Sequence, residues 1–201
     1  MKSLCMGDYF RYDNVCQSIV SIRTAFMSHQ ILHEGKYRRF VSKNGWEYTE
    51  RIRCNEVVVL IPVTDEKKVI FVEQFRVPVQ SKMIEFPAGL IHDMDSNQHE
   101  SREESARREL IEETGYDAGT LEFAFRGPSN SALASDMLYV YLATKLRKVG
   151  PGGGDESENI QVHEVLWTEV EGWLEWQSSQ DKFIDPKIYA GLYYLSKKIK
   201  L

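Results

Sequence analysis

Apolar residues in the first part of the chain occur in short runs with strand-like spacing. Residues 31–33, 37–41 and 46–53 are such runs, and polar turns separate them, the second of which contains Asn44-Gly45. An Asn-Gly pair between two strand-like runs is the strongest short-range signal for a β-hairpin. The pattern predicts an antiparallel strand segment in this part of the chain.

The middle of the chain is predicted to form a sheet. Residues 57–63 read VVVLIPV, a continuous run of mostly β-branched residues that is typical of a strand buried on both faces. A polar turn leads to the next strand at residues 69–75. Further strands are expected at residues 121–125, 137–143 and 160–167.

Two segments have the spacing of helices. Residues 101–114 begin with a capping box, Ser101 followed by Glu104, and end before Gly115, which suits the left-handed position after a helix. A second helix is expected from about Pro186, because apolar residues then recur along one face. These residues are Ile188, Leu192, Leu195 and Ile199. The order of elements predicts an α/β domain with a mixed sheet in the middle and helices outside.

Composition excludes several classes of protein. The 201 residues are 42% hydrophobic and 27% charged, which is enough apolar material for a folded core and excludes a disordered chain. No stretch approaches the ~20 consecutive apolar residues of a membrane span, so no membrane partner is expected. The net charge of −5 gives no general attraction to phosphate polymers, so a long nucleic acid is not expected as a partner either.

Cysteine usage and the first residues bear on location. Cys5, Cys16 and Cys54 lie far apart and form no C-x-x-C pair, which indicates a reducing compartment without disulfides or a structural zinc site. Asp8 and Arg11 interrupt the N-terminal stretch before an apolar core of signal-peptide length forms. A cytoplasmic location is therefore expected.

The candidate chemistry is concentrated on the first predicted helix. Glu109, Glu112 and Glu113 stand at positions i, i+3 and i+4, so their three carboxylates share one helix face. Like charges at this spacing destabilise a helix by ~0.2–0.5 kcal/mol per pair. A divalent cation removes that repulsion, and Mg²⁺ prefers carboxylate oxygens together with water and substrate phosphate. The alternative is an acidic face that is simply exposed to solvent.

The residues around this trio resemble the Nudix box, G-x5-E-x7-R-E-U-x-E-E-x-G-U, in which U is bulky and apolar. The second half of the box is matched by Arg108, Glu109, Leu110, Glu112, Glu113, Gly115 and Tyr116, and the earlier Glu by Glu100. One departure is that ten residues, in place of five, separate Gly89 from Glu100. A five-residue insertion in the loop before the helix explains this spacing, because loops tolerate changes in length. The alternative is a degenerate box that no longer supports catalysis.

Other segments resemble one branch of this family, the ADP-ribose pyrophosphatases and related nucleoside-diphosphate-sugar hydrolases. Residues 72–78 (VEQFRVP), 84–91 (IEFPAGLI), 155–160 (DESENI) and 184–187 (IDPK) carry this resemblance. It implies a Nudix α/β/α sandwich with a mixed β-sheet between helices, preceded by an N-terminal antiparallel strand segment. Residues 1–55 would then serve dimerisation and base binding, and residues 56–201 would form the Nudix hydrolase domain.

The resemblance also implies a metal site. Glu109, Glu112 and Glu113, with the backbone carbonyl of Ala88, would bind Mg²⁺ or Mn²⁺ ions. Glu85 and Glu100 could support these ligands. Arg108 would orient a carboxylate of the box through an ion pair. Glu113 is accordingly counted among the catalytic residues as well as the metal ligands.

Further roles are implied for loops and strand ends. Glu156 or Glu158, in the Gly-rich stretch 149–159, would act as the general base, and the resemblance does not choose between them. Arg76 would pair with the diphosphate, because a guanidinium fork matches phosphate geometry. Glu85 is included among the residues that contact substrate. An aromatic ring and an arginine of the N-terminal strands often bind the nucleotide in this branch, and Trp46 and Arg51 lie at comparable positions, although Trp46 could equally serve packing.

One loop departs from the branch. The motif commonly written S-P-G-x-S-D-E corresponds to residues 127–137, where the loop is shifted and Met137 replaces the final Glu. This departure puts a strict preference for ADP-ribose in doubt. Asp136 is a candidate substitute for the missing carboxylate.

The resemblance therefore implies a metal-dependent pyrophosphohydrolase. It would cleave nucleoside diphosphate sugars such as ADP-ribose to a nucleoside monophosphate and a sugar phosphate, and it would form a homodimer. Two alternatives stay open. One is a Nudix hydrolase of nucleoside triphosphates, dinucleoside polyphosphates or capped RNA. The other is a non-catalytic sensor of nucleotide sugars.

Overall fold

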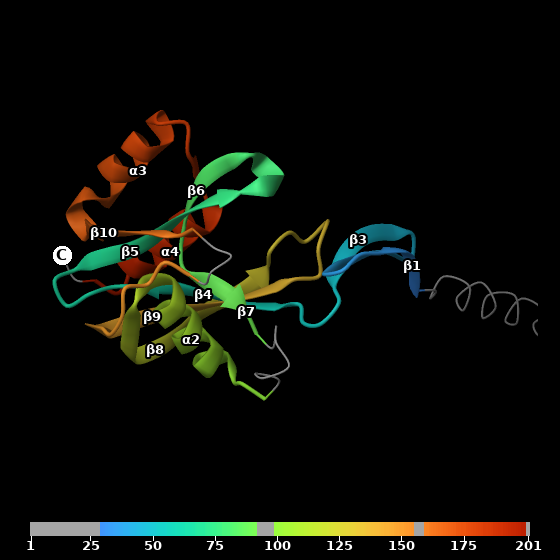
Figure 1. Cartoon of the computed structure of the whole chain (residues 1–201), viewed down its shortest axis with the longest axis horizontal. Helices are drawn as coiled ribbons and strands as arrows, with labels where there is room; N and C mark the ends of the chain where they lie inside the picture. The colour runs from blue at the N-terminus through green and yellow to red at the C-terminus, as the bar shows by residue number, and fades with distance from the viewer. Residues whose placement is uncertain (1–28, 92–98, 155–158, 200–201) are drawn as a thin grey trace, which may run out of the picture.

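The computed structural model of the protein describes residues 29–91, 99–154 and 159–199. Within these ranges the chain forms three β-sheets, and helices cover the outer faces of two of them (Figure 1). The N-terminal residues 1–28 and the two candidate bases, Glu156 and Glu158, lie outside the described residues.

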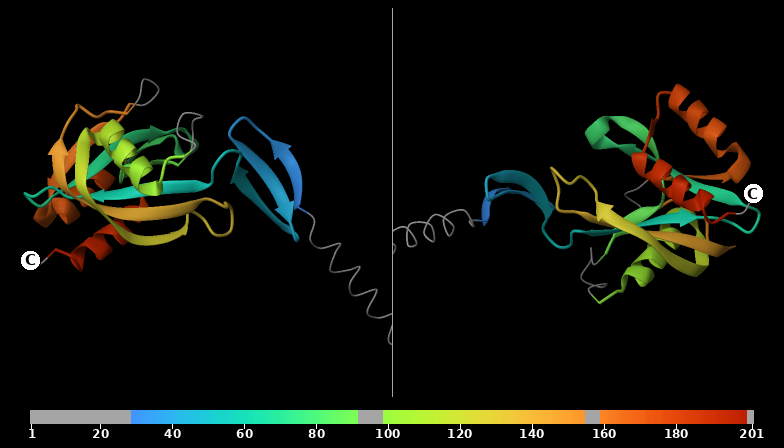
Figure 2. Two further views of the ribbon diagram at one scale, coloured as in Figure 1. Left: turned by 90° about the horizontal axis from the view of Figure 1, so that it is seen from below. Right: turned by 180° about the vertical axis from the view of Figure 1, so that it is seen from behind.

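The N-terminal segment is an antiparallel three-stranded sheet, as predicted. Its strands β1 (His29–Glu34), β2 (Arg38–Lys43) and β3 (Trp46–Arg51) pair in chain order. Asn44 and Gly45 have φ of 54° and 80°, the left-handed values that a two-residue hairpin turn requires. This N-terminal sheet stands at one end of the molecule, beside the main body (Figures 1 and 2).

Two mixed four-stranded sheets form the main body. The first, the central sheet, has the order β7-β4-β9-β8, and β4 runs parallel to β9 and antiparallel to β7. The prolyl residue at the end of β4 is followed by a tight turn to β5, with a single bridge between Val63 and Val69. The strands of the central sheet are β7 (Ala88–Leu90), β4 (Glu56–Pro62), β9 (Met137–Lys148) and β8 (Tyr116–Pro128).

The second sheet, the outer sheet, has the order β10-β5-β6-β11. The sequence predicted one mixed sheet, whereas the main body contains two. The reason is that β4 and β5 diverge after their single bridge and enter different sheets. The predicted α/β class with mixed pairing is confirmed. The strands of the outer sheet are β10 (Gln161–Leu166), β5 (Lys68–Arg76), β6 (Ser81–Glu85) and β11 (Phe183–Ile184), and the 3-10 turn Val77–Val79 links β5 to β6.

Three helices are described. Helix α2 (Arg102–Thr114) lies on the central sheet, whereas α3 (Val170–Ser179) and α4 (Pro186–Ser196) lie on the opposite side of the molecule, and the 3-10 turn Trp167–Glu169 leads into α3 (Figure 1). The sequence did not predict α3, which has an internal Gly172 and no side-chain cap at its N-terminus. None of the helices in the described part of the chain is long and apolar enough to cross a membrane.

Helix α2 is capped at both ends, as its sequence predicted. The Ser101 side chain accepts a hydrogen bond from the Glu104 N–H, and the Glu104 side chain accepts one from the Ser101 N–H, which completes the capping box. At the other end Gly115 is left-handed with φ of 73°, and a Cβ there would lie 2.2 Å from the Gly150 carbonyl oxygen. Only glycine fits this position without a shift of the neighbouring backbone.

Strand β4 is buried on both faces, as its unbroken apolar run predicted. Val59 and Ile61 belong to the apolar cluster that joins both sheets of the main body to α3 and α4. Val58 and Leu60 belong to the cluster beneath α2, together with Leu110. The alternation follows from the two-residue period of a strand, so β4 is the common wall of both cores.

Glu73 on β5 is a buried carboxylate, 2% exposed, that connects strands of the outer sheet. Its oxygens accept hydrogen bonds from Lys82 Nζ at 2.7 Å and Lys182 Nζ at 2.8 Å, and one of them lies 3.0 Å from His163 Nε2. Burial alone would raise the pKa of Glu73, but the hydrogen bonds from Lys182, Lys82 and His163 overcome it and lower the pKa to about 2. The network ties β5 to β6, to β10 and to the residue before β11.

We predict that Glu73→Gln lowers the free energy of unfolding at pH 7 by about 3 kcal/mol, because it removes the counter-charge of two ammonium groups. The wild-type carboxylate contributes its full stability above its ordinary pKa of 4.5 and loses it as the pH falls toward about 2. Urea titrations of both proteins at pH 7 and pH 2.5 measure the difference. Glu175→Gln, at an exposed position of α3, is the control and should cost less than about 0.5 kcal/mol. An undiminished difference between Glu73→Gln and wild type at pH 2.5 would contradict the ionic account.

Candidate functional site

A cavity of about 450 Å³ opens where α2 meets the ends of several strands. Strands β3, β5, β6 and β7, helix α2, the residue before β9 and the first turn of α4 all contribute to its wall. We call it the inner cavity. The residues of its wall that the sequence singled out are Arg51, Arg76, Glu85, Ala88, Glu109, Glu113 and Asp136.

Glu109 reaches the inner cavity through a space that only glycine leaves open. Its side chain is nearly buried and lies against Gly89 of β7. A Cβ built on Gly89 would lie 1.8 Å from the Glu109 carboxyl carbon, far inside contact distance. Gly89 therefore allows the helix carboxylate to lie against the strand.

Glu113 and Glu112 occupy different environments one position apart. Glu113 is 5% exposed, and its Oε2 accepts a hydrogen bond from the Ala88 N–H at 3.2 Å. The Glu112 side chain is 48% exposed and lies at the rim, outside the cavity wall. The three carboxylates that were predicted to share one helix face are thus separated, with Glu109 and Glu113 in the cavity and Glu112 at its edge.

Arg108 holds these carboxylates together. Its Nη1 lies 2.7 Å from Glu109 Oε1 and 3.0 Å from Glu112 Oε2, and its Nε donates to Glu100 at 3.2 Å. Its Nη2 donates to the Leu90 carbonyl at 3.2 Å. Partial burial would lower the pKa of the guanidinium, but Glu100 and Glu109 raise it above its ordinary value, so Arg108 remains charged.

The acidic residues can be tested against the divalent cation that the Nudix box implies. Carboxylate oxygens are the ligands that Mg²⁺ and Mn²⁺ prefer, and the Glu109 and Glu112 carboxylates are gathered at one guanidinium nitrogen. In residues 29–91, 99–154 and 159–199, no three Asp, Glu, His or Cys side chains converge closely enough to hold a metal ion. The residues fit such an ion in donor chemistry, and Arg108 is the partner that Glu109 and Glu112 share in this structure.

Arg76 and Glu85 form a second charged pair in the wall. The Arg76 Nε and Nη2 lie 2.8 and 2.7 Å from Glu85 Oε2. Burial raises the pKa of the Glu85 carboxyl, although the Arg76 guanidinium beside it acts in the opposite direction. The pair fixes a guanidinium at the end of β5, in the wall of the same cavity as the helix carboxylates.

Asp136 connects the N-terminal sheet to the inner cavity. Its Oδ2 accepts from Arg38 Nη2 at 2.5 Å and from Arg51 Nε at 3.2 Å, so β2 and β3 are both tied to the residue that precedes β9. The carboxylate is 3% exposed, and its Oδ1 has no hydrogen-bond partner among the described residues. Sequence reasoning identified Asp136 and Arg51 separately and did not predict that they form an ion pair.

Trp46 is the predicted substrate residue that the structure does not bring to the cavity. It lies at the β2–β3 turn, at the end of the N-terminal sheet remote from Arg51, and is 66% exposed. Its expected role in nucleotide binding stays a prediction.

The Gly-rich stretch closes the end of helix α2. The N–H groups of Gly153 and Gly154 donate to the carbonyls of Glu113 and Glu112 at 2.9 and 3.1 Å. The Ile160 N–H in turn donates to the Gly153 carbonyl at 3.3 Å. Both flanks of the segment that carries the candidate bases are therefore anchored at the end of the acidic helix.

Sequence reasoning missed three polar residues. Lys187 and Ser129 line the inner cavity, and Arg38 holds Asp136 from outside it. Lys187 belongs to residues 184–187 (IDPK), which resemble the same branch of the family, so its positive charge within this motif could have identified it as a site residue. Arg38 had none, because its partner is 98 positions away in the chain.

The chain resembles known proteins in sequence and in fold. It is 29% identical to "Methanol dehydrogenase activator" of Bacillus methanolicus over 73% of this chain and 75% of that one. It is 34% identical to "ADP-ribose pyrophosphatase" of Bacillus subtilis (strain 168) over 74% and 76% of the two chains. A solved structure titled "Crystal structure of ADP compounds hydrolase" superposes with a TM-score of 0.65 at 22% identity, covering 85% of this chain and 91% of that one, which confirms the predicted fold.

The family model described as "NUDIX domain" matches residues 55–189. This match includes β4 to β7, the acidic helix and the start of α4, and it begins after β3, the strand that carries Arg51. The chain therefore belongs to the NUDIX domain family and is a Nudix-type hydrolase, as the residues of its Nudix box predicted.

Proposed function

We propose that this Nudix hydrolase cleaves nucleoside diphosphate sugars such as ADP-ribose to a nucleoside monophosphate and a sugar phosphate. The observation that carries the proposal is the inner cavity, whose wall contains the carboxylates of Glu109 and Glu113 as well as Arg76 and Arg51. A diphosphate needs positive charge on its oxygens and carboxylates that organise the attacking water. The similarity to the ADP-ribose pyrophosphatase of Bacillus subtilis supports this substrate class.

Glu109, Glu112 and Glu113, with the Ala88 carbonyl, would hold Mg²⁺ or Mn²⁺. The bound ion would polarise the phosphoryl oxygens and lower the pKa of the attacking water. Arg76, oriented by Glu85, would bind the diphosphate, and Glu100 would keep Arg108 beside the helix carboxylates. Asp136 would position Arg51 against the nucleotide.

The general base would be Glu156 or Glu158. Support comes from the anchoring of the Gly-rich stretch, since Gly153 and Gly154 bind the carbonyl end of the helix that carries Glu112 and Glu113. A carboxylate on a loop that is anchored in this way could approach a water molecule beside the diphosphate. We propose a cytoplasmic site of action, because the three cysteines of the sequence lie far apart and form no C-x-x-C pair.

We predict that Glu113→Gln and Glu112→Gln each reduce kcat/KM for ADP-ribose at saturating Mg²⁺ by at least about 100-fold. A glutamine oxygen can still accept from the Ala88 N–H, so Glu113→Gln should remove charge and keep the fold. Product analysis with ADP-ribose, GDP-mannose, UDP-glucose and a nucleoside triphosphate measures both rate and substrate class. Glu175→Gln is the control.

Different outcomes separate the competing functions. Turnover near wild type in Glu113→Gln would contradict the role of the acidic helix. Faster product formation from the nucleoside triphosphate than from ADP-ribose, GDP-mannose and UDP-glucose would favour a Nudix hydrolase of nucleoside triphosphates. Tight binding of a nucleotide sugar with no product in Mg²⁺ or Mn²⁺ would favour the non-catalytic sensor.

We predict that Gly89→Ala impairs the site through steric displacement of Glu109. The new Cβ would fall 1.8 Å from the Glu109 carboxyl carbon, so the side chain must leave its place beside β7. Activity should fall about 10- to 100-fold, and the Mg²⁺ concentration for half-maximal rate should rise. Gly127→Ala is the matched control, because a Cβ there meets no atom within 4 Å, and it should keep wild-type activity. Equal activity of Gly89→Ala and Gly127→Ala would show that the close contact of Gly89 with Glu109 is not needed for catalysis.

We further propose that residues 1–55 mediate a homodimer and that residues 56–201 act as the hydrolase unit. The exposed apolar residues of the N-terminal sheet support dimerisation, since such patches mark interaction surfaces. They include Ile31 at 46%, Leu32 at 41% and Trp46 at 66% exposure. Base binding by Trp46 would then take place in the partner's site.

We predict a dimer at micromolar concentration in sedimentation velocity, and a monomer after Ile31→Asp, because the introduced charge would be buried in the interface. Circular dichroism checks that the variant remains folded. A wild-type protein that sediments as a monomer would disprove this arrangement.

A further inference from the structure

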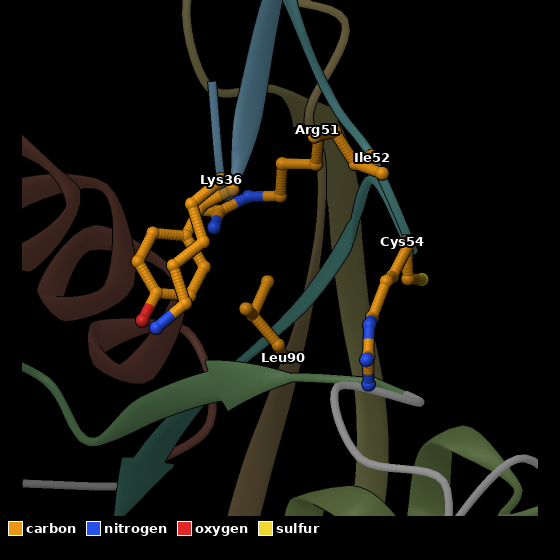
Figure 3. Close-up of a pocket in the computed structure, with 7 residues that line it drawn as sticks. Lys36, Arg51, Ile52, Cys54 and Leu90 are labelled. Carbon is orange, nitrogen blue, oxygen red and sulfur yellow. The ribbon is translucent and has the colours of Figure 1, made fainter. Parts of the chain in front are cut away.

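A second cavity, which we call the outer cavity, lies between the N-terminal sheet and β7 and has a volume of about 490 Å³. Arg51 and Leu90 line both it and the inner cavity, so the two spaces are adjacent. In Figure 3 the side chains of Lys36 and Arg51 extend into the space above Leu90. The lining residues used below are Lys36, Tyr37, Arg51, Ile52, Arg53 and Leu90.

The outer cavity is cationic. Lys36 and Arg51 contribute positive charge to its wall, and none of its described lining residues is an Asp or a Glu. Arg53 also lines the cavity and has an interaction partner of its own. The nearby carboxylate of Asp136 is shared by two guanidinium groups, those of Arg38 and Arg51. Asp136, Arg38 and Arg51 together therefore keep a net positive charge. A pocket for an uncharged base and ribose needs no such excess, which favours an anionic ligand.

Arg51 is oriented for such a ligand. It gives only its Nε to Asp136, at 3.2 Å, and its side chain is 26% exposed. Its two terminal nitrogens have no partner among the described residues, and they are the groups that bind phosphate as a fork. Asp136 thus restricts the rotation of the guanidinium and leaves its binding edge available.

Lys36 supplies a second charge at the mouth of the outer cavity. Its Nζ lies 4.8 Å from the centre of the Tyr37 ring, a cation–π distance, and Tyr37 is 69% exposed. The contact holds the ammonium group near the cavity without neutralising it. Ile52 and Leu90 provide apolar surface that suits a nucleoside.

We propose that the outer cavity binds a phosphate group carried by the ribose of the substrate's nucleoside half, so that the preferred substrate is a ribose-phosphorylated nucleoside diphosphate sugar. The inference rests on the proposed function, because a diphosphate in the inner cavity places the adjoining nucleoside beside Arg51. Arg51 and Lys36 would contact the additional phosphate, while Ile52 and Leu90 would contact the nucleoside.

The test measures binding without hydrolysis. Isothermal titration calorimetry compares adenosine 2′,5′-bisphosphate, adenosine 3′,5′-bisphosphate and AMP, none of which contains a diphosphate bond. At least one bisphosphate should bind the wild-type protein about tenfold or more tightly than AMP. Lys36→Ala should reduce this selectivity ratio at least about threefold. Lys43→Ala is the matched control. Lys43 lies at the other end of β2 from Lys36, five residues or roughly 16 Å beyond Arg38, so its removal should leave the selectivity ratio unchanged.

Three results would overturn the inference: equal affinities for AMP and both bisphosphates, the same selectivity in Lys36→Ala as in wild type, or displacement of the bisphosphate by an equal concentration of inorganic phosphate. The last result would indicate an unspecific anion site. Failure of the proposed hydrolysis is recorded separately by the product assay. Selective bisphosphate binding without any cleavage of nucleoside diphosphate sugars would support the outer cavity as a phosphate site and reject the proposed reaction.

Discussion

The close approach of helix α2 to strand β7 is the constraint on which the site depends. Two carboxylates of this helix are nearly buried, and burying a charge is unfavourable unless the charge is paired and hydrogen-bonded. Arg108 supplies the opposite charge for Glu109, and the Ala88 N–H supplies a hydrogen bond to Glu113. Gly89 supplies the space. The local sequence PAG is therefore as much a part of the acidic site as the glutamates themselves.

The surrounding fold holds this contact in place. Strand β4 lies between β7 and β9 and is buried on both faces, which fixes the position of β7 relative to the core beneath α2. The helix is capped by Ser101 at its start, and Gly153 and Gly154 bind carbonyls in its last turn. Both ends of α2 are thus fixed by hydrogen bonds, so the register of its carboxylates against β7 is well defined.

The sequence was most informative where structure is determined locally. The Asn44-Gly45 turn, the capping box at Ser101 and the buried run of β4 were all predicted, because each depends on neighbouring residues or on a short period. Helix α3 was missed, since it lacks a cap and much of its stability comes from burial of Val170 and Leu174. The division into two sheets was also missed, because the divergence of β4 and β5 depends on tertiary packing.

The same distinction applies to the site. The Nudix box predicted the acidic helix, and the inner cavity includes most residues that the resemblance singled out. The separation of Glu112 from Glu109 and Glu113 could not be predicted, because a helical spacing does not say how far the neighbouring strand covers each position. The contact of Arg38 with Asp136 joins residues 98 positions apart, and a single sequence carries no local signal for it.

The two arginines of the inner cavity show why charge alone is an incomplete description of this site. Arg76 gives two nitrogens to one oxygen of Glu85, whereas Arg51 gives only its Nε to Asp136. Each carboxylate reduces the net charge that a substrate encounters and fixes the direction of the guanidinium. Since Arg51 keeps both terminal nitrogens for a ligand, it offers an oriented fork at the boundary between two cavities. Fixing the direction in advance reduces the conformational entropy that binding must overcome, so a paired arginine can discriminate between phosphate positions better than a mobile one.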